Sequence, residues 1–228
     1  MTAILSNMQA VQTEIIQAAA MAKRDAAQIC LLAVSKTVPS ATIRVAYNHG
    51  QQAFGENYVQ EALDKIHELG DLPIEWHFIG PIQSNKTRLI AENFSWVHSV
   101  DRLKIAERFS EQRPDRLPPL NICVQINVSG EVSKGGVQPE EALALLQRIA
   151  ILPRLKLRGL MAIPAPAEEL DAQRKPFAIM RKLMQQMNNA GLNLDTLSMG
   201  MSHDLTAAIL EGSTMVRVGT AIFGSRKK

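Results

Sequence analysis

The chain has 228 residues, with 25 Lys and Arg against 22 Asp and Glu, so its formal net charge at pH 7 is +3. Apolar residues make up 46% of the chain and charged residues 21%, a balance that excludes a disordered or fibrous protein. The small net charge gives no indication of nucleic-acid binding. No apolar run approaches the ~18 residues of a membrane-spanning helix, and the length suits one large domain.

The N-terminal stretch and the cysteines predict a cytoplasmic protein. No basic region precedes an apolar one at the N-terminus, so we expect no signal peptide. The two cysteines, Cys30 and Cys123, belong to no CxxC pair, which argues against a disulfide framework and against a structural zinc site. The five histidines show neither HxxxH nor HExxH spacing, so no metal site is predicted.

The predicted elements begin with an amphipathic helix at 4–25, where apolar residues recur at helical spacing. A short apolar run at 30–36 is typical of a buried strand, and Pro39 then opens a helix. Strands and helices alternate from there. We expect further strands at 52–57, 75–81, 95–100, 121–127, 155–163, 196–200 and 215–224. We expect helices between them at 58–69, 84–92, 102–112, 138–150, 168–190 and 203–211.

Eight strands separated by helices predict an α/β protein with a parallel sheet. In this length they fit a single (β/α)8 TIM-type barrel. Residues 1–28 would form an extra N-terminal helix and residues 30–225 the barrel, with no second domain in 1–228. An open doubly wound sheet fits less well, because it leaves two edges and no GxGxxG follows the first strand. The helices leave no long apolar stripe uncovered, so we expect a monomer.

Two basic residues stand at unusual places in apolar strands. Lys36 closes the first strand, at the end of the barrel where catalytic groups gather. Desolvation there would lower its pKa and make the amine a nucleophile, although a lysine at a strand end can also extend into solvent. Arg217 lies between Val216 and Val218, so it points into the barrel if the valines face the helices. Its partner there is either a carboxylate from another strand or a ligand.

Small and hydroxyl residues follow the seventh and eighth strands, whose loops often bind phosphate in barrels. Ser202 lies at a predicted helix start, and Gly219 and Thr220 lie just beyond the arginine of the last strand. Together they favour an anion site, whereas separately Ser202 would be a helix cap and Gly219 a bend. Residues near other strand ends are further candidates for the pocket wall: Asn57, His77, Gly80 and Asn127.

The sequence resembles the pyridoxal phosphate homeostasis proteins, the YggS/PROSC-type family, in segments that follow one another in the same order. These segments are AVSKT (33–37), FGENYVQE (54–61), WHFIGPIQSNK (76–86), RGLMAIP (158–164), LSMGMSHD (197–204) and STMVRVGTAIFG (213–224). The resemblance extends from about residue 30 to residue 225, and HFIGPIQSNK is a highly specific block. It implies a single barrel like the N-terminal barrel of alanine racemase.

The resemblance also implies a cofactor, pyridoxal 5′-phosphate (PLP), bound as a Schiff base to Lys36. It places Ser202, Gly219 and Thr220 around the phosphate and Arg217 beside the pyridine nitrogen. Asn57 and Met201 would line the cofactor. The segment at 130–136 matches less closely, so Lys134 receives no role, and neither does His203.

These implications favour a carrier or regulator in intracellular PLP (vitamin B6) homeostasis without strong catalytic activity. Arginine only donates hydrogen bonds, so beside the ring nitrogen it disfavours protonation and weakens PLP as an electron sink. PLP-dependent apoenzymes are the expected acceptors. The alternative is a PLP-dependent amino-acid racemase, although racemases of this fold type add a tyrosine from a second domain or subunit, whereas Tyr47 and Tyr58 belong to the barrel. The barrel alone would also allow an aldolase that uses Lys36 on a phosphosugar.

Overall fold

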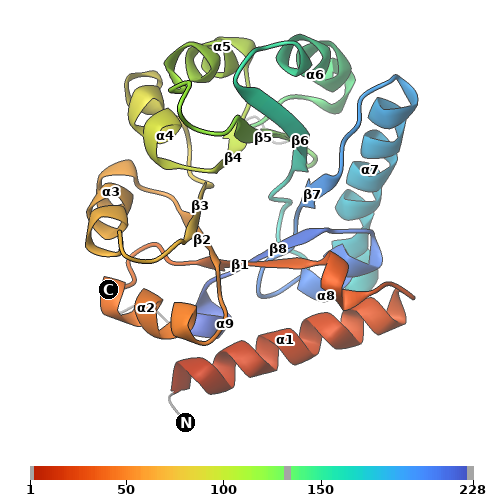
Figure 1. Cartoon of the computed structure of the whole chain (residues 1–228). Coiled ribbons are helices and arrows are strands. Elements are labelled where there is room, and N and C mark those ends of the chain that lie inside the picture. Colours follow the sequence, from red (N-terminus) through yellow and green to blue (C-terminus); the bar gives the residue numbers. More distant parts are fainter. Residues whose placement is uncertain (1–2, 131–134, 225–228) are drawn as a thin grey trace.

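The computed structural model describes residues 3–130 and 135–224. Within these ranges, parallel strands β1 to β8 form a closed barrel in chain order, and β8 pairs with β1 (Figure 1). The strands are β1 (Cys30–Val34), β2 (Ala53–Glu56), β3 (Glu75–Phe78), β4 (Trp96–Val100), β5 (Leu120–Gln125), β6 (Leu155–Met161), β7 (Thr196–Ser198) and β8 (Met215–Val218). The predicted barrel is therefore confirmed.

Helices surround the barrel and connect its strands (Figure 1). They are α1 (Ala3–Met21), α2 (Ser40–Asn48), α3 (Val59–Glu68), α4 (Thr87–Asn93), α5 (Leu103–Gln112), α6 (Ala142–Ala150), α7 (Leu170–Asn189), α8 (Leu205–Leu210) and α9 (Thr220–Phe223). Short 3₁₀ helices lie at Ala26–Gln28, Ser84–Lys86 and Pro139–Glu141. Crossover helices of this kind are what parallel strands require.

The predicted N-terminal helix is present as α1, which lies outside the barrel and packs against α8 and α9 (Figure 1). Its buried face includes Val11 and Ile15, which the helical spacing placed on the apolar side. The helix ends at Met21 instead of residue 25. Lys23 takes a left-handed φ of 54° just beyond it, and such a residue does not continue a right-handed helix.

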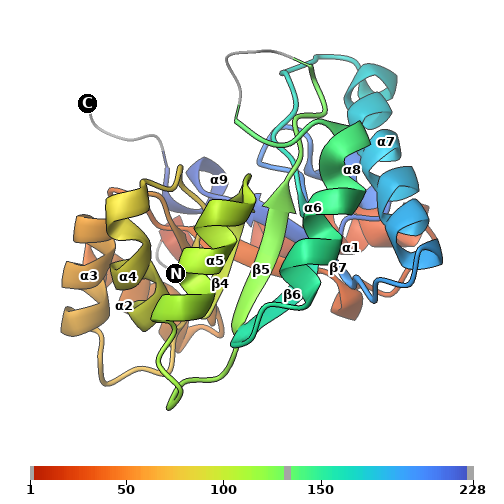
Figure 2. The same ribbon diagram turned by 90° about the horizontal axis from the view of Figure 1, so that it is seen from above.

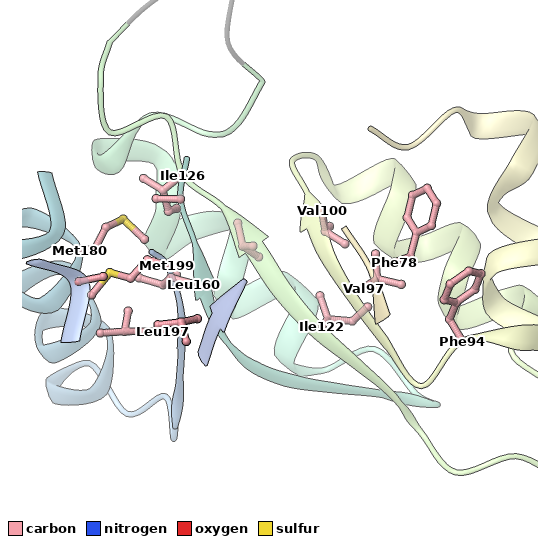
Figure 3. Packing of buried hydrophobic residues seen from close by; sticks show 14 of the residues in the cluster. Phe78, Phe94, Val97, Val100, Ile122, Ile126, Leu160, Met180, Leu197 and Met199 are labelled. Carbon is pink, nitrogen blue, oxygen red and sulfur yellow. The ribbon is translucent and has the colours of Figure 1, made fainter. Parts of the chain in front are cut away.

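The outward-facing side chains of the strands form the main core beneath the helices. Figure 3 shows Leu160 and Leu197 packed near Met180 of α7 on one side, and Val97 and Ile122 near each other on another. Because strand residues alternate in direction, the remaining positions point into the barrel. Apolar side chains there form two small clusters, one of Leu32, Ala53 and Met215 and one of Trp96, Cys123 and Met161.

The end of the chain corrects one prediction. The expected strand over 215–224 stops at Val218, because Gly219 turns the backbone to φ −116° and ψ −73° and α9 follows. A short apolar run does not distinguish a strand from a helix by its periodicity, which explains the error. Figure 2 shows α9 at the end of the barrel toward which the β5 arrow points. Gly219 and Thr220 therefore lie at the C-terminal end of the barrel.

The sequence predicts no membrane-spanning helix, no disulfide and no metal site, and residues 3–130 and 135–224 can be checked for each. There, no helix is long and apolar enough to cross a membrane. Cys30 and Cys123 are both free thiols. Burial raises the pKa of Cys30 to about 11 and that of Cys123 to about 12, so both thiols are protonated at neutral pH. Within the same part of the chain, no group of His, Cys, Asp and Glu has an arrangement that would hold a metal ion.

Candidate functional site

Lys36 lies in a turn directly after β1, and the backbone on both sides of it is tied to α3. Thr37 has a φ of 63°, a left-handed value that is an outlier for a β-branched residue. The Thr37 N–H donates to a carboxylate oxygen of Glu61. On the other side, the Lys65 ammonium donates to the Ser35 carbonyl at 2.7 Å. The turn that carries Lys36 is therefore held from two sides.

A buried cluster of charges lies beneath this turn. Glu56, the last residue of β2, accepts hydrogen bonds at Oε1 from Ser35 Oγ at 2.6 Å and from Lys65 Nζ at 2.8 Å. Burial raises the pKa of Glu56, and the nearby charge of Lys65 opposes that rise. The sequence analysis did not single these residues out. The four-residue spacing of Glu61 and Lys65 on a helix is the one pattern that signals part of the cluster.

A cavity of about 160 Å³ brings most of the predicted site residues together. It is lined by Val34, Lys36, Met201, Ser202, His203, Arg217, Gly219 and Thr220. A second cavity of about 420 Å³ shares Val34, Lys36, Gly219 and Thr220 with the first. Its other walls are Ile4, Thr37, Val38, Pro39, Thr42, Phe223 and Gly224. These walls were not predicted, because small and apolar loop residues carry no chemical pattern.

Arg217 is buried inside the barrel, with 3% of its surface exposed. Its neighbours Val216 and Val218 belong to the core under the helices, which confirms the predicted orientation. Its two terminal nitrogens donate to Ser198 Oγ and to the Ala162 carbonyl, both at 2.9 Å. Burial lowers the pKa of Arg217 to about 10, so the guanidinium stays charged at neutral pH. No carboxylate of the described residues forms an ion pair with it, so the carboxylate alternative is not observed.

Gly219 stands where β8 passes closely along β1. A Cβ at this position would lie 3.1 Å from the Val34 carbonyl oxygen and 3.3 Å from its Cβ, so a side chain would push the two segments apart. Thr220 begins α9 and is exposed. The close approach brings the β8–α9 junction to the turn of Lys36, as the shared cavities show.

Ser202 lies in a tight loop between β7 and α8. The loop is closed by the Met201 N–H, which donates to Asp204 Oδ1 at 2.6 Å. Helix α8 begins at Leu205, later than the predicted residue 203. Asp204 occupies the N-cap position of α8. The alternative interpretation of Ser202 as a helix cap is therefore wrong. Its place in the wall of the smaller cavity is the role that the geometry supports.

Asn57 follows β2 and lines neither of these cavities. Its Oδ1 is buried and accepts no hydrogen bond from any described residue. Gly80 packs so tightly here that a Cβ at residue 80 would lie 2.2 Å from the Asn57 carbonyl oxygen. A buried acceptor without a donor is unfavourable, so Asn57 remains a candidate for contact with a ligand.

Other predicted residues lie elsewhere. His77 is fully buried inside the barrel and lines neither cavity, and Asn127 is also buried. Lys134 falls outside the described residues, as does the basic tail at 225–228. Tyr58 is largely exposed at the start of α3.

Comparison with known proteins gives consistent matches. The sequence matches the family described as "Alanine racemase, N-terminal domain" over residues 1–227. A relative named "Pyridoxal phosphate homeostasis protein", from Pseudomonas aeruginosa, is 61% identical over 99% of this chain and 97% of its own length.

Solved structures agree with these matches. PipY of Synechococcus elongatus PCC7942, solved with PLP bound, has a TM-score of 0.81 and 38% identity, covering 92% of this chain and 100% of its own. Alanine racemase from Corynebacterium glutamicum has a TM-score of 0.71 at 19% identity, over 99% of this chain and 62% of its own, and so shares the fold. The chain therefore belongs to the alanine racemase N-terminal domain family and, within it, to the pyridoxal phosphate homeostasis proteins.

Proposed function

We propose that this protein binds PLP as a Schiff base to Lys36 and acts in intracellular PLP homeostasis as a carrier or regulator. One observation carries the proposal: Lys36 shares a cavity with Ser202, Arg217, Gly219 and Thr220, although these residues lie in or after three different strands. The relatives' names and the PLP-bound structure of PipY support it. Residues 1–228 would act as a single PLP-binding domain, monomeric and cytoplasmic, with PLP-dependent apoenzymes as acceptors.

The residues present fit this cofactor. PLP needs an amine for its aldehyde, donors for its phosphate and space for its ring, and the two joined cavities offer Lys36, the Ser202 hydroxyl and the Gly219 backbone. The lack of a side chain at Gly219 lets this residue lie against Val34, and its backbone forms part of the wall of both cavities. Asn57 Oδ1 is a buried acceptor without a described donor, but Asn57 lines neither cavity, so a contact with the cofactor would require a shift of this residue.

The side chains of the site favour holding the cofactor over using it. Bound PLP supplies an aldehyde for reversible attachment and an electron sink for amino-acid chemistry. Arg217 keeps its proton at neutral pH and only donates hydrogen bonds. Beside the pyridine nitrogen of PLP it would therefore disfavour protonation of that nitrogen. The backbone on either side of Lys36 is held by Glu61 and Lys65, so the lysine extends from a fixed turn.

The test is covalent trapping followed by peptide mapping. The protein is loaded with PLP, reduced with borohydride and digested, and the mass of the pyridoxyl group is located along the chain. We expect the label on Lys36 in the wild type and its loss from that peptide in Lys36→Ala. Lys104→Ala, on the exposed face of α5, is the matched control and should label like the wild type.

Two results would contradict the proposal. One is wild-type protein that acquires no label at saturating PLP. The other is a label spread over exposed lysines, including Lys104, without preference for Lys36. A sugar phosphate that is trapped on Lys36 where PLP is not would favour the aldolase alternative.

A further inference from the structure

A series of polar side chains crosses the interior of the barrel. It begins at Glu75, the first residue of β3, whose Oε1 lies 2.8 Å from His77 Nε2. His77 Nδ1 lies 2.9 Å from His98 Nε2, and His98 Nδ1 lies 2.8 Å from Ser198 Oγ. Ser198 Oγ accepts from Arg217 at 2.9 Å. The two histidines and the serine are fully buried.

The two ends of this series lie in different cavities. The side chain of Glu75 is half-exposed and lines a cavity of about 500 Å³ together with Cys30, Gln51 and Pro73. Arg217 lines the cavity of Lys36. Because Glu75 begins its strand while the Lys36 cavity lies where strands end, the series connects opposite ends of the barrel.

When both imidazoles are neutral, the chemistry of the two ends determines the direction of every hydrogen bond. Arginine only donates and an ionised carboxylate only accepts. Ser198 therefore accepts from Arg217 and must direct its own O–H to His98 Nδ1. His98 then donates from Nε2 to His77 Nδ1, and His77 donates from Nε2 to Glu75. The reverse direction would place an unprotonated nitrogen of His77 against the Glu75 carboxylate.

We infer that Glu75, His77, His98 and Ser198 form one directed chain of hydrogen bonds that positions Arg217, with both histidines neutral and protonated on Nε2. The electrostatic effects of burial are consistent with this arrangement. Burial lowers the pKa of His77 and lowers that of His98 further, and the hydrogen bond from His77 lowers the pKa of Glu75.

This chain of hydrogen bonds explains how the buried Arg217 is held without a direct ion pair to any described carboxylate, although the nearby charge of Asp204 raises its pKa. Ser198 can accept from Arg217 because its proton is taken by His98, and the second terminal nitrogen donates to the Ala162 carbonyl. Both acceptors are neutral, so they orient the guanidinium without pairing its charge. These residues are positioning residues for the cofactor site, a role that rests on the proposed function.

The first test is nitrogen-15 NMR of histidine-labelled protein at neutral pH without added PLP. We expect two histidines with a protonated Nε2 and an unprotonated Nδ1, assigned with His77→Gln and His98→Gln. The exposed ring of His203 provides an internal reference. A charged ring or a protonated Nδ1 at either buried histidine would overturn the directed chain, whether or not the protein binds PLP.

The second test measures coupling between the two ends. Glu75→Leu removes the terminal acceptor at a half-exposed position, and we expect it to shift the His98 signals. Glu75→Gln keeps a carbonyl acceptor and should restore them. Unchanged His98 signals in Glu75→Leu would contradict a connected chain.

The third test concerns positioning of Arg217. Ser198→Ala leaves a buried donor of Arg217 unsatisfied, so we expect PLP affinity roughly tenfold weaker and a shifted absorbance maximum of bound PLP. Ser198→Thr keeps the hydroxyl and should recover both. Normal affinity and spectrum in Ser198→Ala would overturn the positioning role. Absence of PLP binding in the wild type would instead contradict the proposed function. The NMR result would still show whether the directed chain of hydrogen bonds exists.

Discussion

At the residue scale, Gly80 shows how the barrel mouth depends on the absence of one side chain. Gly80, two residues after the end of β3, passes directly over the backbone of Asn57, and a Cβ would lie 2.2 Å from the Asn57 carbonyl oxygen and 2.7 Å from its Cα. Both contacts are to backbone atoms, which cannot rotate away. The position of Asn57, a predicted cofactor residue, therefore depends on Gly80.

We expect Gly80→Ala to destabilise the protein by about 1–3 kcal/mol, the usual effect of overpacking. It should also weaken PLP binding, because Asn57 must shift. Gly70→Ala is the matched control, since a Cβ there meets nothing closer than 3.4 Å, and it should change stability little. Urea unfolding and PLP titration measure both effects. Equal stability of the two variants would show that the β2 and β3 ends separate freely.

At the element scale, α3 fastens two strands and the Lys36 turn to one another. From successive turns of this helix, Glu61 and Lys65 reach Thr37, Ser35 and the buried Glu56. Lys65 is nearly buried, with 7% of its side chain exposed. Because a buried carboxylate that loses its only cation is strongly unfavourable, the helix and the two strands depend on this contact together.

We expect Lys65→Met to lower the free energy of unfolding by about 3–5 kcal/mol relative to the wild type. This difference should be larger at about pH 8 than at about pH 5. The folded-state pKa of Glu56 is already raised above 4.5, so its contribution to stability falls as pH rises through that pKa. Without Lys65 the pKa rises further, and ionising Glu56 costs more.

Urea unfolding at both pH values provides the measurement. Arg44→Met removes an exposed ion pair with Asp71 and serves as the control, with little change at either pH. A Lys65→Met deficit that is the same at both pH values would show that Glu56 is not the group responsible.

At the scale of the whole molecule, closure of the barrel determines which side chains surround Lys36. Among the described residues that line its two cavities, none is a tyrosine, aspartate or glutamate. His203 is a further basic side chain of the lining, and it is exposed. A two-base racemase would therefore have to take its second base from His203 or from outside these two walls.

We expect PLP-loaded protein to promote exchange of the amino-acid Cα proton with deuterated water no faster than free PLP does. Proton NMR of alanine and other common amino acids gives the rate, with an alanine racemase as positive control. Exchange well above the level of free PLP that disappears in Lys36→Ala would establish racemase-type activity. His203→Ala would then show whether the exposed imidazole takes part.

The sequence by itself determined the order of elements, favoured a closed barrel over an open sheet, and placed Lys36, Arg217, Ser202 and Gly219 in or near the ends of strands. These features follow from local periodicity, and the direction of Arg217 follows from the valines on either side of it. The family resemblance added Met201, which lines the same cavity. Strand lengths and α9 were predicted less well, because short apolar runs suit both strand and helix.

Tertiary structure alone decided which residues meet across the barrel. Alternation puts His77 and His98 inside, but only closure brings Ser198 of β7 to His98 of β4, a hundred residues away. The Glu56–Lys65 cluster likewise required α3 to pack over the β1 turn. Local backbone preferences act over a few residues, whereas such contacts depend on the register of a closed sheet, and no short sequence pattern encodes that register.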